Sequence, residues 1–314
     1  MASQGSKVLA SDYNGLQTTV SNILGTGSGT LGYGQSVSSS QVSTSGKIYA
    51  TDWINLVNDI IKIAVHQGVT VSISSPTSGQ IVTYNNNSTN CFLAYSNAVT
   101  SISVNPQVFP GAGQYSGTVL DNPTLTNMTN GTHYHTSVLS FASANAFRYF
   151  FNAGGRIEIT PSIAGGGLSS PDGSTTLDQS WQTIFNRIGT TYLYYNSSVV
   201  TNTSYLGQSV SVASSIGAYE LTTSYQVLST SATPSGGIYY PNQYQVTAKV
   251  DSASSPTAIT FQMKFSDTSL GTGSPPWNIT YPVDSTITDT ISYTRASGSY
   301  VSVVPPTLSS STFT

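Results

Sequence analysis

The sequence is poor in charged residues. They make up 7% of its 314 residues, against about 25% in an ordinary globular protein. The nine lysines and arginines are scattered along the chain. Nucleic-acid backbones are bound by clustered basic residues, so the sequence predicts no nucleic-acid partner. The formal net charge of −3 implies little electrostatic repulsion between copies of the chain.

Cysteine and long apolar runs are also scarce. The single cysteine, Cys91, has no partner for a disulfide within the chain and is expected to be a small buried residue. No apolar stretch approaches the roughly 18 residues that span a bilayer, so we expect no membrane insertion. Residues 1–7 lack the apolar core of a signal peptide. These absences predict a protein made in the cytoplasm and not exported by a signal peptide.

Serine, threonine, asparagine, glycine and tyrosine are abundant instead, with 20 tyrosines in the chain. Low charge with many aromatic residues is not the composition of a disordered protein, which combines high charge with few aromatics. Tyrosine and threonine favour strands, whereas glycine, asparagine and serine favour tight turns. The composition therefore predicts a folded protein that is mainly β-structure.

Residues 11–67 carry the strongest helical signals. Apolar side chains recur at steps of three and four in two runs, 12–24 and 51–66. The predicted apolar stripes consist of Tyr13, Leu16, Val20, Ile23 and Leu24 in the first run, and of Trp53, Leu56, Val57, Ile60 and Ala64 in the second. Neither helix can bury its stripe alone, so we expect an antiparallel helical hairpin docked on a larger core.

The turn between these runs contains a glycine pattern with a known functional meaning. Residues 27–32, Gly-Ser-Gly-Thr-Leu-Gly, match the dinucleotide-binding pattern G-x-G-x-x-G. That pattern holds a pyrophosphate only where it leads from a strand into the N-terminus of a helix. Here it follows a helix and precedes Ser/Thr-rich sequence. We therefore predict an interhelical loop and no bound cofactor.

Gly68 ends the helical region, and strand-like alternation of period two begins at residue 69. The sequence predicts an α+β fold, mainly β, in three parts. The N-terminal helical hairpin region covers 1–67, and a mixed β/α domain packed with it covers 68–217. An antiparallel β-sandwich-like domain with a Ser/Thr-rich tail covers 218–314.

Two further helices are expected in the middle part. One follows Ser143 and carries Phe147, Phe150 and Phe151, and the other follows Asp178. The apolar face predicted for the second consists of Trp181, Ile184, Phe185 and Ile188. Residues 91–140 are expected to hold short strands interrupted by prolines.

His133 and His135 are the best candidates for metal ligands. Positions i and i+2 of a strand point to the same face, so both imidazoles could bind one ion. Two ligands are too few, although a three-fold axis would supply six. The alternative is a pair of polar loop histidines after Asn130 and Gly131. Because no third ligand lies nearby in the sequence, we predict no metal site.

Three acidic residues lie close enough in sequence to suggest a glycosidase-like pair of carboxylates. They are Glu158, Asp172 and Asp178. Each also has a simpler interpretation: Glu158 on the exposed side of a strand, Asp172 in a turn before Gly173, and Asp178 as a helix cap. A serine triad stays open because serines are numerous, yet no Gly-x-Ser-x-Gly stands at a strand-to-helix junction. We predict no catalytic residue.

Tyrosines form two dense groups that suit a protein interface, since tyrosine contributes large contact area and a hydroxyl for the rim. The interface candidates are Tyr192, Tyr194, Tyr195, Tyr239, Tyr240 and Tyr244. The alternative is that tyrosine is simply a common strand residue.

Several segments resemble virion structural proteins of tailed bacteriophages, in particular tail and fibre-associated proteins of marine and cyanobacterial phages. The first carries Tyr-Asn-x-Leu and, further on, Ile-Leu-Gly-Thr-Gly-Ser-Gly-Thr-x-Gly-Tyr-Gly-Gln within 13–35, and continues with Trp, Asp-Ile and Val-His-Gln as far as residue 67. The others are 147–157, 181–189 and 217–226, so the resemblance touches most of the chain. These are packing and turn motifs, with no catalytic residue known among them.

The resemblance implies a non-enzymatic structural subunit of the virion, in the tail, neck, baseplate or fibre-attachment region. Its partners would be other virion proteins and further copies of itself, as a trimer or hexamer. Two alternatives are a capsid decoration protein and an adhesin that binds a host-surface glycan. An enzyme that depolymerises glycans is a third.

Overall fold

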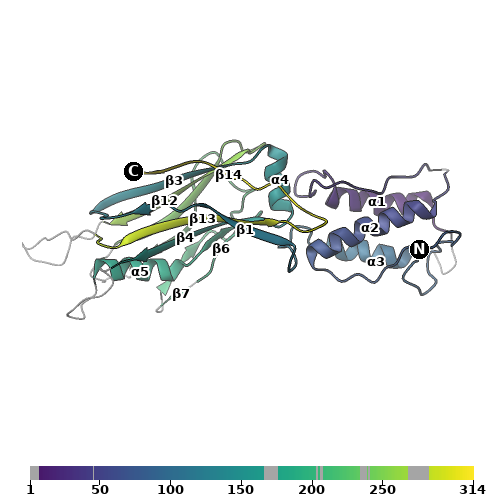
Figure 1. Ribbon diagram of the computed structural model, residues 1–314, viewed down its shortest axis with the longest axis horizontal. Coiled ribbons are helices and arrows are strands. Elements are labelled where there is room, and N and C mark those ends of the chain that lie inside the picture. Colours follow the sequence, from purple (N-terminus) through teal and green to yellow (C-terminus); the bar gives the residue numbers. More distant parts are fainter. Residues whose placement is uncertain are drawn as a thin grey trace, which may run out of the picture. The chain divides into compact units, whose positions relative to one another are not determined.

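The computed structural model describes residues 7–44, 46–165, 176–202, 204–205, 208–233, 239, 241–267 and 283–314. Within them the chain forms five helices and two six-stranded antiparallel sheets (Figure 1). The predicted α+β, mainly β class is therefore confirmed. In the described part of the chain, every helix is too short or too polar to cross a bilayer.

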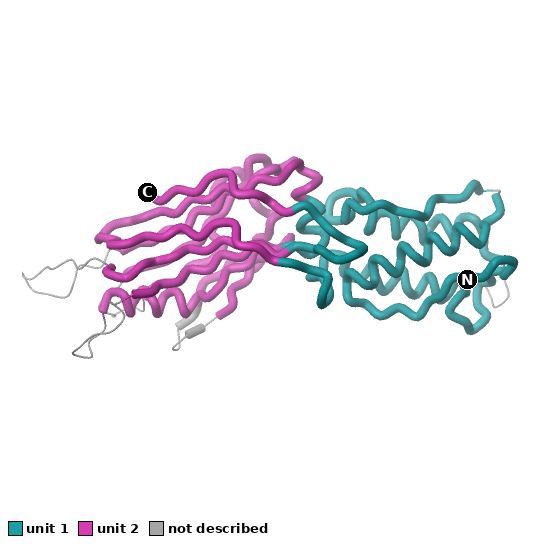
Figure 2. The backbone as a smooth tube through the Cα atoms, in the orientation of Figure 1, with its two compact units in different colours: residues 1–116, 148–155, 295–304 teal, residues 117–147, 156–294, 305–314 magenta. Residues whose placement is uncertain are grey.

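The chain forms two compact units (Figure 2). Unit 1 comprises residues 1–116, 148–155 and 295–304, and unit 2 comprises 117–147, 156–294 and 305–314. This division differs from the three sequential parts expected from the sequence.

Unit 1 is built around helices α1 (Ala10–Leu24), α2 (Ala50–Gln67) and α3 (Phe92–Ser103). Each of the three contacts the other two. Every residue of the two predicted apolar stripes is buried. The Trp53 ring lies 5.0 Å from that of Tyr13 and 5.2 Å from that of Tyr95, measured between centroids, so aromatic contacts join all three helices.

Helix α3 corrects the expectation of short strands at the start of 91–140. Tyr95, Ala98, Val99 and Ile102 are buried at helical spacing, which gives one apolar face against α1 and α2. The first two helices are therefore members of a three-helix group, and a separate helical hairpin is not observed.

The glycine-rich segment after α1 is held in place by hydrogen bonds that its carbonyl groups accept from Arg148. The Arg148 guanidinium donates to the carbonyl oxygens of Leu31 and Thr26, each at 2.7 Å. Gly32 has φ +104°, where a side chain would be strained, and a Cβ there would clash with the Thr26 carbonyl. The segment follows a helix and leads into chain without regular secondary structure, which is not the setting of a pyrophosphate-binding loop.

The first sheet has the order β1–β13–β4–β5–β6, with β2 also paired to β13. Its strands are β1 (Tyr115–Asp121), β2 (Thr124–Leu125), β4 (Arg156–Ala164), β5 (Thr191–Leu193), β6 (Ser198–Val200) and β13 (Thr286–Ala296).

The second sheet has the order β14–β3–β12–β11–β10–β9. Its strands are β3 (Gly131–Ser140), β9 (Ser211–Val212), β10 (Gln226–Ala232), β11 (Gln243–Val250), β12 (Ala258–Asp267) and β14 (Thr307–Phe313). The short strands β7 (Ser204–Tyr205) and β8 (Gln208–Ser209) pair separately.

The strands after residue 218 do not form a domain of their own, which corrects the predicted boundary. β12 pairs with β3 over ten residues, and β13 pairs with β4 over nine. The C-terminal strands thus complete sheets begun by residues 115–164. Alternation predicts that a segment is a strand but does not identify its neighbour, and these neighbours lie more than 100 residues apart.

The two remaining helices are α4 (Ala144–Asn152) and α5 (Leu177–Ile188), close to the predicted positions. In α5 the predicted apolar residues are all buried, and the helix contacts β4 of one sheet and β10 of the other. Its N-cap is Thr176, whose hydroxyl accepts from the Gln179 amide at 3.1 Å. Asp178 therefore lies inside the first turn and is not the cap.

Candidate functional site

Strand β3 places His133 and His135 on the same face, as the spacing predicts, but their surroundings differ. Residues 135, 137 and 139 alternate as the buried face of the strand, and His135 is 0% exposed. His133 is partly exposed, with Nε2 3.0 Å from the Thr129 carbonyl oxygen. Of the two histidines, His135 is therefore the one whose buried surroundings could form a site.

His135 lies between two carboxylates of the other sheet. Its Nδ1 is 2.8 Å from Asp289 Oδ2 on β13, and its Nε2 is 3.0 Å from Asp121 Oδ2 on β1. Both aspartates are buried. One imidazole of the second sheet thus joins two neighbouring strands of the first sheet.

Three hydroxyl groups complete this arrangement. Ser137 Oγ is 2.8 Å from His135 Nε2 and also donates to Asp121 Oδ2. Tyr244 donates to Asp289 Oδ1 at 3.0 Å. Ser311 Oγ of β14 lies 3.2 Å from His135 Nε2. We call these six residues the His135 cluster: His135, Asp121, Asp289, Ser137, Tyr244 and Ser311.

The carboxylates favour a charged imidazole. Burial alone would lower the pKa of His135, but the hydrogen bond and charge of Asp289, and then those of Asp121, outweigh it and raise the pKa above its ordinary value. An imidazolium donates from both nitrogens, which suits acceptors on both sides of the ring. The Tyr244 hydroxyl stays protonated, because burial and then the charge of Asp289 raise its pKa.

Ser137, His135 and Asp289 have the hydrogen-bond distances of a serine triad, but the arrangement does not suit catalysis. Ser137 and His135 are both 0% exposed, so a substrate carbonyl has no path to the hydroxyl. A protonated imidazole cannot accept the serine proton, and that hydroxyl already donates to Asp121. The geometry therefore fits a structural cross-link between sheets.

The geometry also leaves little basis for metal binding at the two histidines. Both nitrogens of His135 are engaged by carboxylates and hydroxyls. In the described ranges, no group of three or more His, Cys, Asp or Glu side chains is placed to hold an ion.

The three acidic candidates do not form a shared site in the described chain. Glu158 accepts from Arg156 at 2.9 Å and from Thr294 at 2.6 Å on the outer face of β4. Asp178 is buried and accepts from Ser285 at 3.0 Å. Burial and the charge of Asp284 raise the pKa of Asp178. Asp172 lies outside the described residues.

The candidate interface tyrosines divide into different environments. Tyr192 on β5 and Tyr194 just after it are partly exposed, and the Arg156 guanidinium of β4 lies 4.8 and 5.9 Å from their ring centroids. Tyr195 and Tyr239 are also partly exposed. Tyr240 lies outside the described residues.

Tyr244 corrects the prediction, because it is fully buried in the His135 cluster and cannot serve a surface interface. The sequence held a signal for this, since Tyr244, Val246, Ala248 and Val250 alternate as one apolar face. Asp289 gave a similar signal, because it interrupts the apolar face of Ile287 and Ile291 on β13. Sequence reasoning used neither signal.

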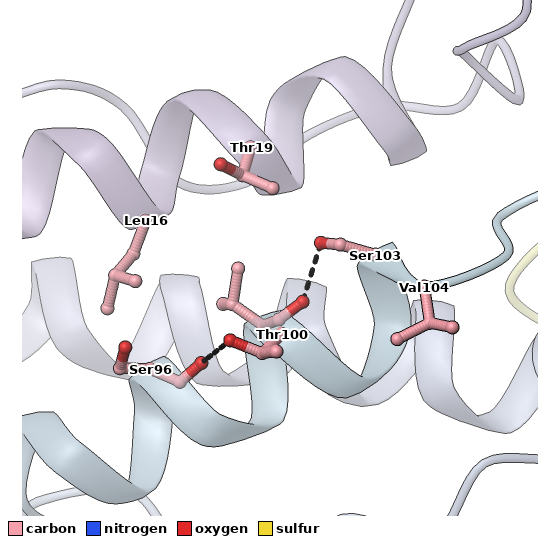
Figure 3. Close-up of a pocket in the computed structure, with 7 residues that line it drawn as sticks. Leu16, Thr19, Ser96, Thr100, Ser103 and Val104 are labelled. Atoms are coloured by element: carbon pink, nitrogen blue, oxygen red, sulfur yellow. Dashed lines mark hydrogen bonds between the residues drawn. The ribbon is translucent and has the colours of Figure 1, made fainter.

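A surface groove of about 500 Å³ lies between α1 and α3 in unit 1 (Figure 3). It is lined by Leu16, Thr19, Ser96, Val99, Thr100, Ser103 and Val104. The hydroxyls of Thr100 and Ser103 donate to carbonyls one turn earlier in α3, at 3.0 and 2.6 Å. No lining side chain is titratable, so the groove offers no acid–base chemistry.

One flank of unit 2 exposes the edges of both sheets. β14 ends the second sheet and β1 ends the first, and Asp121 and Ser311 both reach His135 Nε2, so the two edges lie on the same side. Residues 117–119 and 307–310 are exposed, with Val119 at 56%. None of the exposed residues of these strands is charged. We call residues 117–119 and 307–314 the open flank.

The two buried histidines should give opposite pH responses. The folded-state pKa of His135 is raised, so its stabilisation is complete below the unfolded pKa of about 6.5 and is lost as the pH rises through the folded value. Burial lowers the pKa of His66 in α2 to about 4, against a smaller opposite effect of the Ala153 backbone. Its stabilisation is therefore lost as the pH falls from about 6.5 towards 4.

Thermal unfolding between pH 4 and 9 measures both effects. We expect the melting temperature to fall on either side of about pH 6.5. His66→Leu should reduce the fall in melting temperature below about pH 6.5 and leave the fall above that pH unchanged. An unchanged acid limb in this variant would contradict the assignment to His66.

Comparison of the chain with protein-family models, with curated proteins and with solved structures finds no match.

Proposed function

We propose that the protein is a structural subunit of a tailed-phage virion that works by assembling with copies of itself and with other virion proteins. The single observation that carries this proposal is the open flank, where two strand edges are exposed without a charged side chain. Folded proteins generally protect strand edges with charge, proline, bulges or a covering element, because an exposed edge pairs with other chains. β14 has a β-bulge between Leu308 and Ser310, but the stretch after it offers an uncharged edge, which suits a protein whose role is association.

The His135 cluster supports the same role. We infer that the two sheets face each other as a sandwich, because His135 of one sheet contacts Asp121 and Asp289 of the other at hydrogen-bond distance. A hydrogen-bonded ionic cluster between sheets fixes their relative position. A subunit that transmits contacts through a particle benefits from such a fixed core.

The resemblance of residues 13–67, 147–157, 181–189 and 217–226 to tail and fibre-associated proteins supports our proposal that the subunit belongs to the tail, neck, baseplate or fibre-attachment region. We propose a homo-oligomer, a trimer or hexamer in keeping with tail symmetry. The function is assembly and not catalysis.

The composition leads to a testable property of this assembly. With 7% charged residues, contacts between subunits cannot depend on salt bridges, whose exposed forms contribute about 0–1 kcal/mol each. Apolar contacts and neutral hydrogen bonds are not screened by salt, whereas urea weakens them. We expect the oligomer to persist in about 1 M sodium chloride and to dissociate in urea.

Light scattering across a sodium chloride titration and a urea titration tests this expected behaviour of the oligomer. Dissociation to monomers at high sodium chloride, with resistance to urea, would mean that the few charges hold the subunits together. A chain that is monomeric at every concentration would overturn the proposed homo-oligomer.

A further inference from the structure

We propose that the open flank joins two copies of the chain by antiparallel pairing of β14 with β14, about a two-fold axis at Thr312. This inference rests on the assembly role proposed above and names the surface and the partner. The partner is a second copy of this chain.

The hydrogen bonds of β14 determine which of its backbone groups are available. Thr314 exchanges both backbone hydrogen bonds with Tyr134 of β3, at 2.8 and 2.9 Å. Because hydrogen-bonded positions alternate along an antiparallel pair, Thr312 and Ser310 also face β3. The N–H and C=O groups of Ser311 and Phe313 therefore face the other side, where the described chain places no further strand.

These outward groups allow a symmetric register centred on Thr312. A two-fold axis at Thr312 places Ser311 of one copy opposite Phe313 of the other, and the reverse pair follows by symmetry. Each pair exchanges two hydrogen bonds, so about four bonds form, and every outward backbone group of Ser311 and Phe313 finds a partner. Thr312 then lies opposite its own copy in a non-hydrogen-bonded position.

The side chains are compatible with this pairing. Ser311 and Phe313 point inward, where the Phe313 ring stacks on His135 at 4.9 Å between centroids, so the inner face of β14 is already fixed to the fold. Thr312 and Thr314 point outward and are exposed. The outward pairs would be Thr312 with Thr312, and Ser310 with Thr314, and such hydroxyl pairs stabilise antiparallel strands.

The absence of charge on β14 favours a second copy as the partner. In a two-fold arrangement every charge would meet or approach its own copy, and like charges across strands are destabilising. β14 carries none. The β-bulge between Leu308 and Ser310 ends the regular stretch, so the pairing covers residues 310–314. Of the two assemblies proposed above, a two-fold contact is compatible with the hexamer, as three pairs of subunits joined by three-fold contacts, and not with the trimer.

A single cysteine substitution tests the register. In a non-hydrogen-bonded pair the Cα atoms are about 4.5 Å apart, within the range of a disulfide. We expect Thr312→Cys to give mostly disulfide-linked dimer on mild oxidation of the full chain, measured on a non-reducing gel. The matched control is Ser310→Cys. Ser310 is also exposed, but in this register it lies opposite Thr314 of the other copy, four positions from the other Ser310, so this variant should stay unlinked. The parent chain controls for Cys91, which is buried.

Ser311→Pro provides a second measurement. It removes an outward N–H without touching the pairing with β3, and proline is tolerated where an edge N–H faces away from the sheet. Two hydrogen bonds are lost per dimer, so we expect the dimer to dissociate at about 10- to 30-fold higher concentration.

The outcomes separate the two proposals. Efficient linking of Thr312→Cys but not of Ser310→Cys supports the two-fold pairing. No linking, or equal linking of both variants, overturns it, and if light scattering still shows an oligomer, the assembly role stands and another surface forms the contact. A monomeric parent chain overturns both.

Discussion

Replacing His135 with leucine is expected to lower the free energy of unfolding by about 3–5 kcal/mol. The substitution removes the cation between Asp121 and Asp289 and leaves two buried carboxylates without a counter-charge. It also removes the ring on which Phe313 stacks. Urea unfolding followed by circular dichroism measures the change.

The matched control is His133→Leu, two residues along the same face of β3. The His133 imidazole lies beside the Thr129 carbonyl and is partly exposed, so the loss should be about 1 kcal/mol or less. Equal losses in the two variants would show that the His135 cluster contributes no more than an ordinary surface contact.

Replacing Trp53 with alanine should have an effect of similar size in unit 1, about 3–5 kcal/mol. Trp53 is 3% exposed and lies between the rings of Tyr13 and Tyr95, so truncation opens a cavity where the three helices meet. Tyr49→Ala is the control, because Tyr49 precedes the same helix and is 64% exposed.

Soluble yield and thermal melting measure both variants. We expect Trp53→Ala to fold poorly, whereas Tyr49→Ala should melt within a few degrees of the parent chain. A normal melting temperature for Trp53→Ala would mean that the aromatic group does not support unit 1.

The helices show what local sequence can predict. The stripes of α1 and α2 and the apolar face of α5 were predictable because helical spacing is a local property. Helix α3 was missed because its sequence is rich in serine, threonine and asparagine, which favour helices weakly, and because prolines follow it. Tertiary packing of Tyr95 and Ile102 stabilises a helix that propensity alone does not predict.

The His135 cluster shows what local sequence cannot predict. Strand alternation places His133 and His135 on one face, but the partners of His135 come from positions 14 and 154 residues away. Which strands meet depends on the pairing of β3 with β12 and of β13 with β4, which alternation does not encode. An aspartate on an otherwise apolar strand face, such as Asp289, is the local sign that such a partner exists.

Strand β14 connects the His135 cluster of unit 2 with the open flank. Ser311 and Phe313 contact His135 with their side chains, while their backbone groups form the open edge. A fixed inner face keeps the edge strand in place, and a strand held in one geometry pairs with less loss of conformational entropy. The buried cluster would thereby prepare the flank for association.

The most direct test of the proposed assembly role is a cryo-electron microscopy map of particles purified from the source that encodes this chain. We predict repeated copies in the tail, neck, baseplate or fibre-attachment region, with neighbouring copies in contact through residues 310–314. Absence of the chain from purified particles, or a position on the outer capsid lattice, would contradict the account.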